Sequence, residues 1–195
     1  MRVRLEKVFA IDAPASAAWG LLRDIRAVAE CMPGAQITER VDDTHYTGQV
    51  NVKLGPANVT FKGTIEVKSV DADKQQIQLL GKGSDATGSS AANMDLTAHV
   101  RDTGDGKCEV VGVSEVTVTG KMANFGARMM TQVSDQILKQ FGANFANRVV
   151  AMGEGEAAVE AAARVAKQPR EINAPALMWQ VIISFLKNLF GAKKV

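Results

Sequence analysis

The chain has 195 residues, of which 46% are hydrophobic and 23% charged, so it can bury one good core and carry an appendage. Its net charge of +2 is close to neutral and no basic run is interleaved with aromatic residues, which excludes the usual signature of nucleic-acid binding. Cys31 and Cys108 match no metal spacing, so we expect two reduced thiols in a cytoplasmic protein. The first residues lack the apolar run of a secretory signal.

The first predicted elements are a strand and two short helices. Apolar and polar residues alternate over residues 3–11, which predicts the strand. Helical spacing follows Pro14, with Trp19, Leu22 and Ile25 on the buried side. A second short helix continues from there and ends at Pro33-Gly34.

Six further strands are predicted between residues 35 and 118, because apolar and polar residues alternate between turn signals. The turns fall at Asp42-Asp43, Gly55-Pro56, Asp71–Asp73 and Thr103–Gly106. The small, polar stretch Gly81–Ala91 is interpreted as a strand end and a loop. Consecutive strands joined by tight turns predict an antiparallel sheet.

One long amphipathic helix is predicted for Gly120–Val150, a stretch without proline. Its apolar residues recur in steps of three and four and share one face: Met122, Phe125, Met129, Val133, Ile137, Phe141, Phe145 and Val149. At about 1.5 Å per residue, such a helix is roughly 45 Å long. We therefore predict an α+β, helix-grip arrangement, in which a curved antiparallel sheet wraps around the long helix.

The residues predicted to point from the sheet toward this helix are small: Gly48, Gly63, Gly81, Ala92, Ala98, Gly112 and Ser114. Small residues let a sheet bend, and they leave space that a close-packed interior would fill with larger side chains. We therefore expect a cavity lined mainly by apolar groups. Strand and helix phase place six residues in it: Phe61, Met94, Phe125, Met129, Val133 and Ile137. The alternative is that side chains of the helix fill the space.

Five short motifs occur in order along residues 1–150. They are Asp12-Ala-Pro14 followed by Trp19, Cys31-Met32-Pro33-Gly34, Val52-Lys53-Leu54-Gly55-Pro56 with Phe61-Lys62-Gly63, the small residues of Gly81–Ala91, and Gly120–Arg128. With them the chain resembles the family of the carbon monoxide dehydrogenase G subunit, within the START-like (SRPBCC) superfamily. The resemblance implies a non-catalytic accessory of aerobic molybdenum CO dehydrogenase, linked with its assembly or membrane attachment. It names no ligand, and related domains serve other molybdenum hydroxylases.

No catalytic or metal-binding constellation is visible in the sequence. His45 and His99 stand alone on predicted strands and are interpreted as surface or structural residues. No nucleophile has an adjacent base, and the glycines of Gly81–Gly88 lack the context of a nucleotide-binding loop. The turn Cys31–Gly34 is interpreted either as a gate or docking surface near one mouth of the cavity, or as a rigid connector.

The composition changes after Val150. Residues 151–175 are rich in Ala and Glu and then contain two prolines, which predicts a flexible or partly helical linker. Residues 176–195 are predicted to contain an amphipathic helix, whose run Ala176–Phe190 is shorter than the roughly 20 residues that a transmembrane helix needs, so we expect it to lie in the membrane plane. Eight residues are expected to bind the membrane: Leu177, Trp179, Ile182, Phe185, Leu186, Phe190, Lys193 and Lys194. The alternative is a helix that packs on its own domain or on a partner.

These observations combine into one hypothesis: a peripheral protein on the cytoplasmic face of the membrane that recruits molybdenum CO dehydrogenase and binds a lipophilic respiratory quinone, such as menaquinone or ubiquinone, in the cavity. Such an enzyme passes electrons to a respiratory acceptor, commonly a quinone too apolar to cross water. The alternative is an adaptor or assembly factor without a bound small molecule. A third interpretation, a START-like enzyme acting on an apolar substrate, is disfavoured because no paired acid and base occupy predicted inward positions.

Overall fold

The computed structural model describes residues 1–54, 57–125, 127–168 and 172–173, and at the edges of its gaps it describes only the path of the backbone. The elements follow in the order β1 (Arg2–Ile11), α1 (Ala15–Leu22), α2 (Ile25–Cys31), β2 (Ala35–Arg40), β3 (His45–Leu54), β4 (Ala57–Asp71), β5 (Gln76–Asp85), β6 (Ser90–Gly104), β7 (Lys107–Gly120), the 3-10 helix η1 (Lys121–Phe125), α3 (Ala127–Ala151), α4 (Glu156–Ala166) and β8 (Ile172–Asn173). The predicted order of one strand, two short helices, six strands and a long helix is therefore confirmed.

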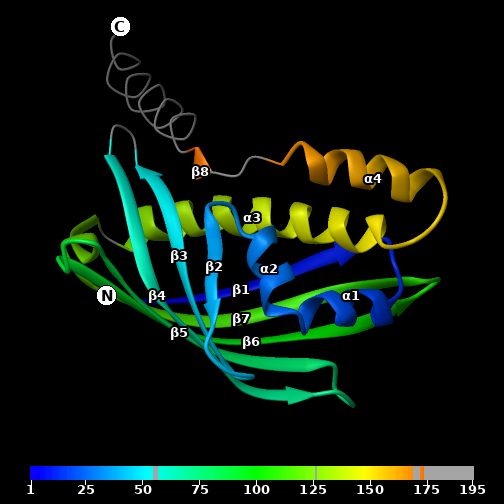
Figure 1. The fold of residues 1–195 in the computed structure, drawn as a ribbon, viewed down its shortest axis with the longest axis horizontal. Coiled ribbons are helices and arrows are strands. Elements are labelled where there is room, and N and C mark those ends of the chain that lie inside the picture. Colours follow the sequence, from blue (N-terminus) through cyan, green and yellow to red (C-terminus); the bar gives the residue numbers. More distant parts are fainter. Residues whose placement is uncertain (55–56, 126, 169–171, 174–195) are drawn as a thin grey trace, which may run out of the picture.

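The strands form one sheet in the order β1-β7-β6-β5-β4-β3-β2, and each neighbouring pair is antiparallel. The two-residue β8 pairs in parallel with β3 at Val52 and Lys53. The sheet curves around α3, while α1 and α2 lie toward one end and α4 runs along α3 (Figure 1). The predicted helix-grip fold is confirmed; the predicted tail helix falls in residues 174–195, outside the described residues.

The break between the two short helices comes from a helix cap at Asp24. Its carboxylate accepts hydrogen bonds from the backbone N–H groups of Arg26 and Ala27, at 3.0 and 3.1 Å. These are donors that the first turn of a helix leaves without a partner. The chain therefore starts a new helix, α2, shortly after α1 has ended.

Two predicted boundaries differ from the structure. The stretch Gly81–Ala91, interpreted from sequence as a strand end and a loop, is mostly strand, because β5 continues to Asp85 and β6 begins at Ser90. The small residues remain in the strands because Gly81 and Gly83 pair with both β4 and β6. Gly81 and Gly83 are small because they face the interior of the domain, and not because they belong to a loop. The turn itself occupies only residues 86–89.

The long helix also begins later than predicted, since residues 121–125 form η1 and α3 starts at Ala127. Gly120 has a φ of +75°, which turns the chain out of β7. The backbone N–H of Lys121 then donates to the carbonyl oxygen of Ser89, and that of Met122 donates to Oγ of Ser90. These bonds tie the first turn to the β5–β6 hairpin, so a regular α-helix starts only after it.

The solid core lies at the end of the molecule that α1 and α2 cover. There the C-terminal half of α3 places Phe145 and Val149, both fully buried, in one cluster with Trp19 of α1. The sheet contributes Ile77 of β5 and Val110 of β7 to the same cluster. The predicted apolar stripe of the helix is therefore core at this end.

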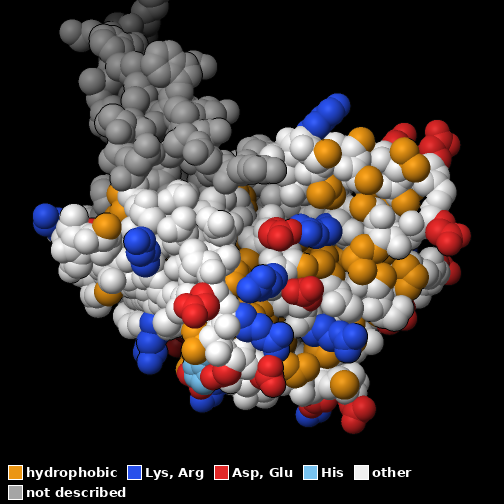
Figure 2. Space-filling view, in the orientation of Figure 1, with side chains coloured by type: hydrophobic (Ala, Val, Ile, Leu, Met, Phe, Trp, Pro, Cys, Tyr) orange, Lys and Arg blue, Asp and Glu red, His pale blue; other side chains and the backbone are white. Residues whose placement is uncertain are grey.

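Part of the stretch predicted as a linker is the helix α4, which packs against α3 through the buried Ala158 and Ala161. Alanines are good helix formers, and their small side chains allow close packing of two helices. Other apolar side chains of this region stay exposed, among them Val159 and Met152, and Figure 2 shows hydrophobic side chains gathered over α4 and α3. No helix among the described residues is long and apolar enough to span a membrane.

Candidate ligand-binding cavity

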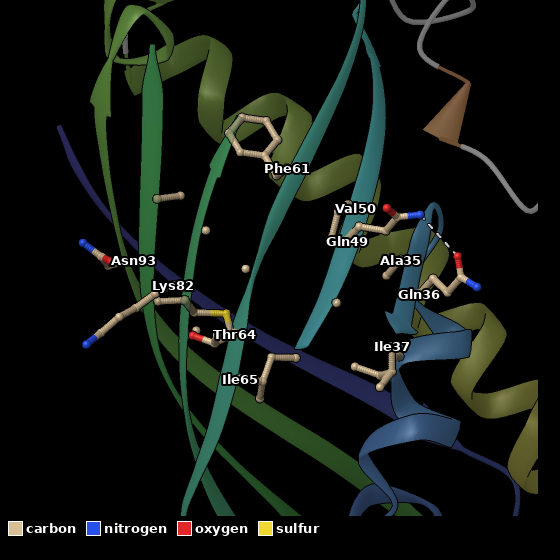
Figure 3. Close-up of a pocket in the computed structure, with 17 residues that line it drawn as sticks. Ala35, Gln36, Ile37, Gln49, Val50, Phe61, Thr64, Ile65, Lys82 and Asn93 are labelled. Atoms are coloured by element: carbon tan, nitrogen blue, oxygen red, sulfur yellow. Dashed lines mark hydrogen bonds between the residues drawn. The ribbon is translucent and has the colours of Figure 1, made fainter. Parts of the chain in front are cut away.

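A cavity of about 320 Å³ lies on the inner side of strands β2 to β6, beside Ala29 of α2 (Figure 3). It is at the small end of the range typical of small-molecule sites. The side chains that face it are apolar or absent, and they are Ala29, Ala35, Ile37, Gly48, Val50, Phe61, Gly63, Ile65, Gly81, Gly83, Ala92 and Met94. This end of the domain is hollow, whereas the α1 and α2 end is packed.

The floor of the cavity is a row of residues without large side chains, aligned across four strands. Gly48 of β3 pairs with Gly63 of β4, Gly63 pairs with Gly83 of β5, and Gly83 pairs with Ala92 of β6. Because side chains alternate between the two faces of a sheet, residues paired in this way share a face. Four adjacent strands therefore leave their main chain uncovered at the same level.

Two of these glycines are required by the curvature of the sheet. A Cβ atom on Gly63 would lie 2.0 Å from the carbonyl oxygen of Lys82, and one on Gly48 would lie 2.8 Å from that of Gln36. Both distances are shorter than real contacts between such atoms, so no larger residue fits without moving a neighbouring strand. The prediction that small inward residues bend the sheet agrees with this geometry, but no described side chain of the long helix is among the residues that line the cavity.

Outward-facing residues also border the cavity, through their main chain. Gln36, Thr64, Lys82 and Asn93 are exposed, yet all four line it. Figure 3 shows the side chains of Lys82 and Asn93 pointing away from the cavity. These four residues therefore border the cavity with their backbone, and the charged end of the Lys82 side chain lies outside it.

The structure brings together two of the six residues predicted for the cavity, Phe61 and Met94. Val133 and Ile137 are half-buried on α3 and are not among its lining residues. Phe125 and Met129 fall where only the backbone is described. The sequence-based prediction missed three other lining residues, although strand alternation places them on the same face as Gly48 and Phe61. These are Ile37, Val50 and Ile65.

A hydrogen-bonded hairpin stands beside the cavity, because Asp85 at its start pairs with Phe61 in the sheet. The Asp85 carboxylate accepts hydrogen bonds from the backbone N–H of Ser90 at 3.0 Å and from the hydroxyls of Thr87 and Ser89 at 2.8 Å each. These bonds, chiefly that from the Ser90 N–H, lower the pKa of Asp85. Since Ser90 also accepts a hydrogen bond from Met122, the carboxylate indirectly holds the start of the long helix.

The family model for the carbon monoxide dehydrogenase G subunit (CoxG) matches residues 8–150, which include every strand from β2 to β7 and the cavity. The chain belongs to the CoxG family. The resemblance inferred from its motifs is thereby confirmed. No curated protein matches the chain in sequence.

Solved structures support the fold of this CoxG family member. A conserved protein from Geobacillus kaustophilus superposes with a TM-score of 0.68 at 17% identity, covering 75% of this chain and 95% of its own. A START superfamily protein from Mycobacterium smegmatis gives 0.59 at 14% identity, with 77% and 99% covered. The Zhui aromatase/cyclase from Streptomyces sp. R1128 gives 0.52 at 14% identity, with 85% and 96% covered. At these identities the likeness concerns the fold alone.

The turn Cys31–Gly34 of this CoxG domain joins the packed end to the hollow end. The buried side-chain amide of Asn144 donates to the Cys31 carbonyl oxygen at 2.9 Å, and Arg148 is ion-paired with Glu30. Asn51 of β3 donates its N–H to the Gly34 carbonyl at 2.9 Å. Held from α3 and from β3, the turn has the contacts of a rigid connector, the second of the two interpretations from sequence.

Among the described residues, none of the ionisable groups with a shifted pKa lines the cavity, although Asp85 lies beside it. Burial raises the pKa of the Cys31 thiol to about 11. His45 Nδ1 is 2.9 Å from the Asp42 carboxylate in the β2–β3 turn, which is a structural role. Within the described part of the chain, no group of three or more His, Cys, Asp or Glu residues is placed to hold a metal ion. The residues expected to bind the membrane all lie in 174–195, outside the described residues.

Proposed function

We propose that this protein is a non-catalytic accessory of aerobic molybdenum CO dehydrogenase that recruits the enzyme to the cytoplasmic face of the membrane and binds a lipophilic respiratory quinone, such as menaquinone or ubiquinone, in its cavity. The observation that carries the proposal is an apolar cavity with a bare main-chain floor, in a family named after a component of that enzyme. Such a site favours an apolar ligand over a charged one, because burying a charge without a partner is costly.

The reaction of CO dehydrogenase explains why a quinone is a suitable ligand for the cavity. Oxidation of one CO with one water gives CO2, two protons and two electrons. A quinone that takes up two electrons and two protons becomes a quinol, which balances the reaction. A quinone is poorly soluble in water, so a protein that shields it next to the enzyme would shorten its path through solvent.

The position of the quinone is part of the proposal. We place its ring among Phe61, Met94 and the small residues of the floor. Of the helix residues predicted from sequence, Val133 and Ile137 would contact the isoprenoid chain, as would Phe125 and Met129. Since about 320 Å³ is small for a complete polyprenyl quinone, part of the chain would extend beyond this cavity.

The first experiment is mass spectrometry of an organic extract of the full-length protein, purified from a host that makes quinones. We expect a near-stoichiometric quinone that is absent from an unrelated membrane-associated control. A matched variant, Ile65→Trp, would fill the cavity and is expected to lose the quinone while it remains folded. A clean extract from folded, membrane-bound protein would favour the adaptor without a bound small molecule.

A second experiment separates anchoring from ligand binding. Deletion of Pro175–Val195 removes the predicted amphipathic helix, so the shortened protein should no longer co-sediment with vesicles that contain anionic lipid. Quinone binding by the remaining domain should survive. If the shortened protein still partitions fully with membranes, the role assigned to the tail is wrong.

A further inference from the structure

The glycines that line the cavity are of two kinds. A Cβ atom on Gly48 or Gly63 would clash with neighbouring backbone at less than 3.0 Å, whereas the contacts of a Cβ atom on Gly81 or Gly83 are longer. A Cβ on Gly83 would lie 3.3 Å from the carbonyl oxygen of Lys62, and one on Gly81 would lie 3.3 Å from the flexible end of Met94. The end of the Met94 side chain can move aside, so the fold tolerates alanine at Gly81. At Gly83 the added methyl group requires the backbone of β4 to shift by a few tenths of an ångström.

Backbone conformation does not require glycine at Gly81 and Gly83 either, since neither is among the glycines with positive φ. A glycine inside a strand is unfavourable, because it loses more conformational freedom on folding and offers no side chain to pack. Gly81 and Gly83 thus weaken β5, although neither is required by its φ angle or by a contact below 3.0 Å. What they provide is an uncovered surface, since both line the cavity.

We infer that this surface is a subsite for a flat, fused-ring head group, which lies on the main chain between Gly63 and Ala92 and requires the absence of side chains at Gly81 and Gly83. The inference rests on the proposed function and assigns the ring, not the chain, of the quinone to the floor. Neighbouring strands are about 4.8 Å apart, so the row from β3 to β6 is roughly 14 Å wide, enough for two fused rings to lie flat.

The borders of the floor suit an aromatic ring. Phe61 stands on one side, next to the row in the sheet, and Met94 stands on the other, paired with Gly81. Aromatic edges and thioether sulfurs both make favourable contacts with a ring. An isoprenoid or acyl chain gains little from a flat floor, because a flexible chain fits a groove of any cross-section.

The test compares a ring without a chain and a chain without a ring, both offered to the full-length protein. The ring probe is dimethylnaphthoquinone, in which a methyl group replaces the chain and leaves no free ring position for the thiols to attack. The chain probe is geranylgeraniol. The variants are Gly83→Ala and Gly81→Ala, and the matched control is Gly20→Ala in α1, whose added Cβ meets nothing within 4 Å.

We expect the wild-type protein and Gly20→Ala to bind the ring probe equally in equilibrium dialysis. Gly83→Ala should bind it about tenfold more weakly or worse, with Gly81→Ala affected in the same direction. Binding of geranylgeraniol should change by less than about twofold in both floor variants. The melting temperature of Gly81→Ala should be unchanged or higher, because only the flexible end of Met94 has to move. That combination marks a ligand surface, because a structural glycine would lower the melting temperature when replaced.

Two results would overturn the subsite. If the floor variants bind the ring probe as tightly as the wild type, no ring rests on the floor. If the wild type binds geranylgeraniol but not the ring probe, the cavity holds chains, and an apolar ligand site survives without a ring platform. If neither probe nor an intact menaquinone binds, the proposed function fails, and the subsite fails with it.

Discussion

Gly142 of α3 and Phe9 of β1 are in direct contact, because a Cβ atom built on Gly142 would lie 2.2 Å from Cδ1 of the Phe9 ring. The same ring packs edge-on against Phe141, with centroids 5.7 Å apart, and Phe141 in turn contacts Phe145 at 5.8 Å. An aromatic chain thus runs from the edge strand into the fully buried core. The long helix therefore contacts the sheet at Gly142, a position without a side chain.

Replacing Gly142 by alanine should therefore destabilise the domain despite the higher helix propensity of alanine. The added methyl group must displace the Phe9 ring, and overpacking of this kind costs about 1–3 kcal/mol. The control is Gly20→Ala in α1, which meets open space and should be neutral or stabilise by about 0.4–1 kcal/mol. Urea unfolding at constant m-value measures both. Equal midpoints for the two variants would show that the Gly142 contact carries no stability.

Asn144 should be important for stability although it lies far from the cavity. Its amide donates to the Cys31 carbonyl, and both residues are buried. Asn144→Leu leaves that carbonyl without its partner, which should lower the free energy of unfolding by about 1–3 kcal/mol. Gln136→Leu, at an exposed position of the same helix, serves as the control and should change it by no more than about 0.5 kcal/mol. A loss equally large in the control would assign the effect to hydrophobicity and not to the hydrogen bond.

The fold was predictable because its signals are local. A few neighbouring residues are enough to recognise each element. Examples are the alternation of apolar and polar residues in β1 and β3, the glycine-rich turn at Thr103–Gly106, and the helical spacing of apolar residues from Met129 to Val149. The start of α3 was not predictable in this way. It depends on bonds from Lys121 and Met122 to Ser89 and Ser90, which lie about thirty positions earlier in the chain.

The sequence predicted that an apolar cavity exists, but it predicted only some of the residues that line it. Small inward residues predicted empty space, yet they could not tell which end of the sheet was hollow. Ala98 lies in the packed core, while Ala92, six residues earlier on the same strand, lines the cavity. The difference depends on where α1 and α2 settle on the sheet. That is a long-range property, set by core packing rather than by any single strand.

The Cys31 thiol should be unreactive in the folded protein. Burial raises its pKa to about 11 from an ordinary value of 9.0, which lowers the reactive thiolate fraction roughly a hundredfold near neutral pH. Because the folded pKa is the higher one, its contribution to stability is complete below the unfolded pKa. The contribution is lost as the pH rises toward 11. A Cys108→Ser variant isolates Cys31, and iodoacetamide labelling followed by mass spectrometry should detect adduct in urea but almost none in buffer. Rapid labelling of the native variant would contradict the burial.

The ionisation of Asp85 should make the stability of the start of the long helix dependent on pH. Hydrogen bonds from Ser90, Thr87 and Ser89 hold the pKa of its carboxyl below the usual value, so the folded state favours the ionised form. The resulting stabilisation is present above the unfolded pKa, about 3.9, and is lost as the pH falls through the folded value.

We expect Asp85→Asn to reduce the amide-exchange protection of Ser90 and Met122 at neutral pH, because one neutral amide oxygen replaces the two charged acceptor oxygens that hold the hairpin. In the wild type the same protection should fall only in acid. Asp71→Asn is the matched control: its carboxylate also has a lowered pKa, but it accepts from Lys74 in the β4–β5 turn, away from η1. It should leave the Met122 amide unchanged. Equal loss of Met122 protection in both variants would mean that the sheet loosens as a whole and that Asp85 has no special link to the helix.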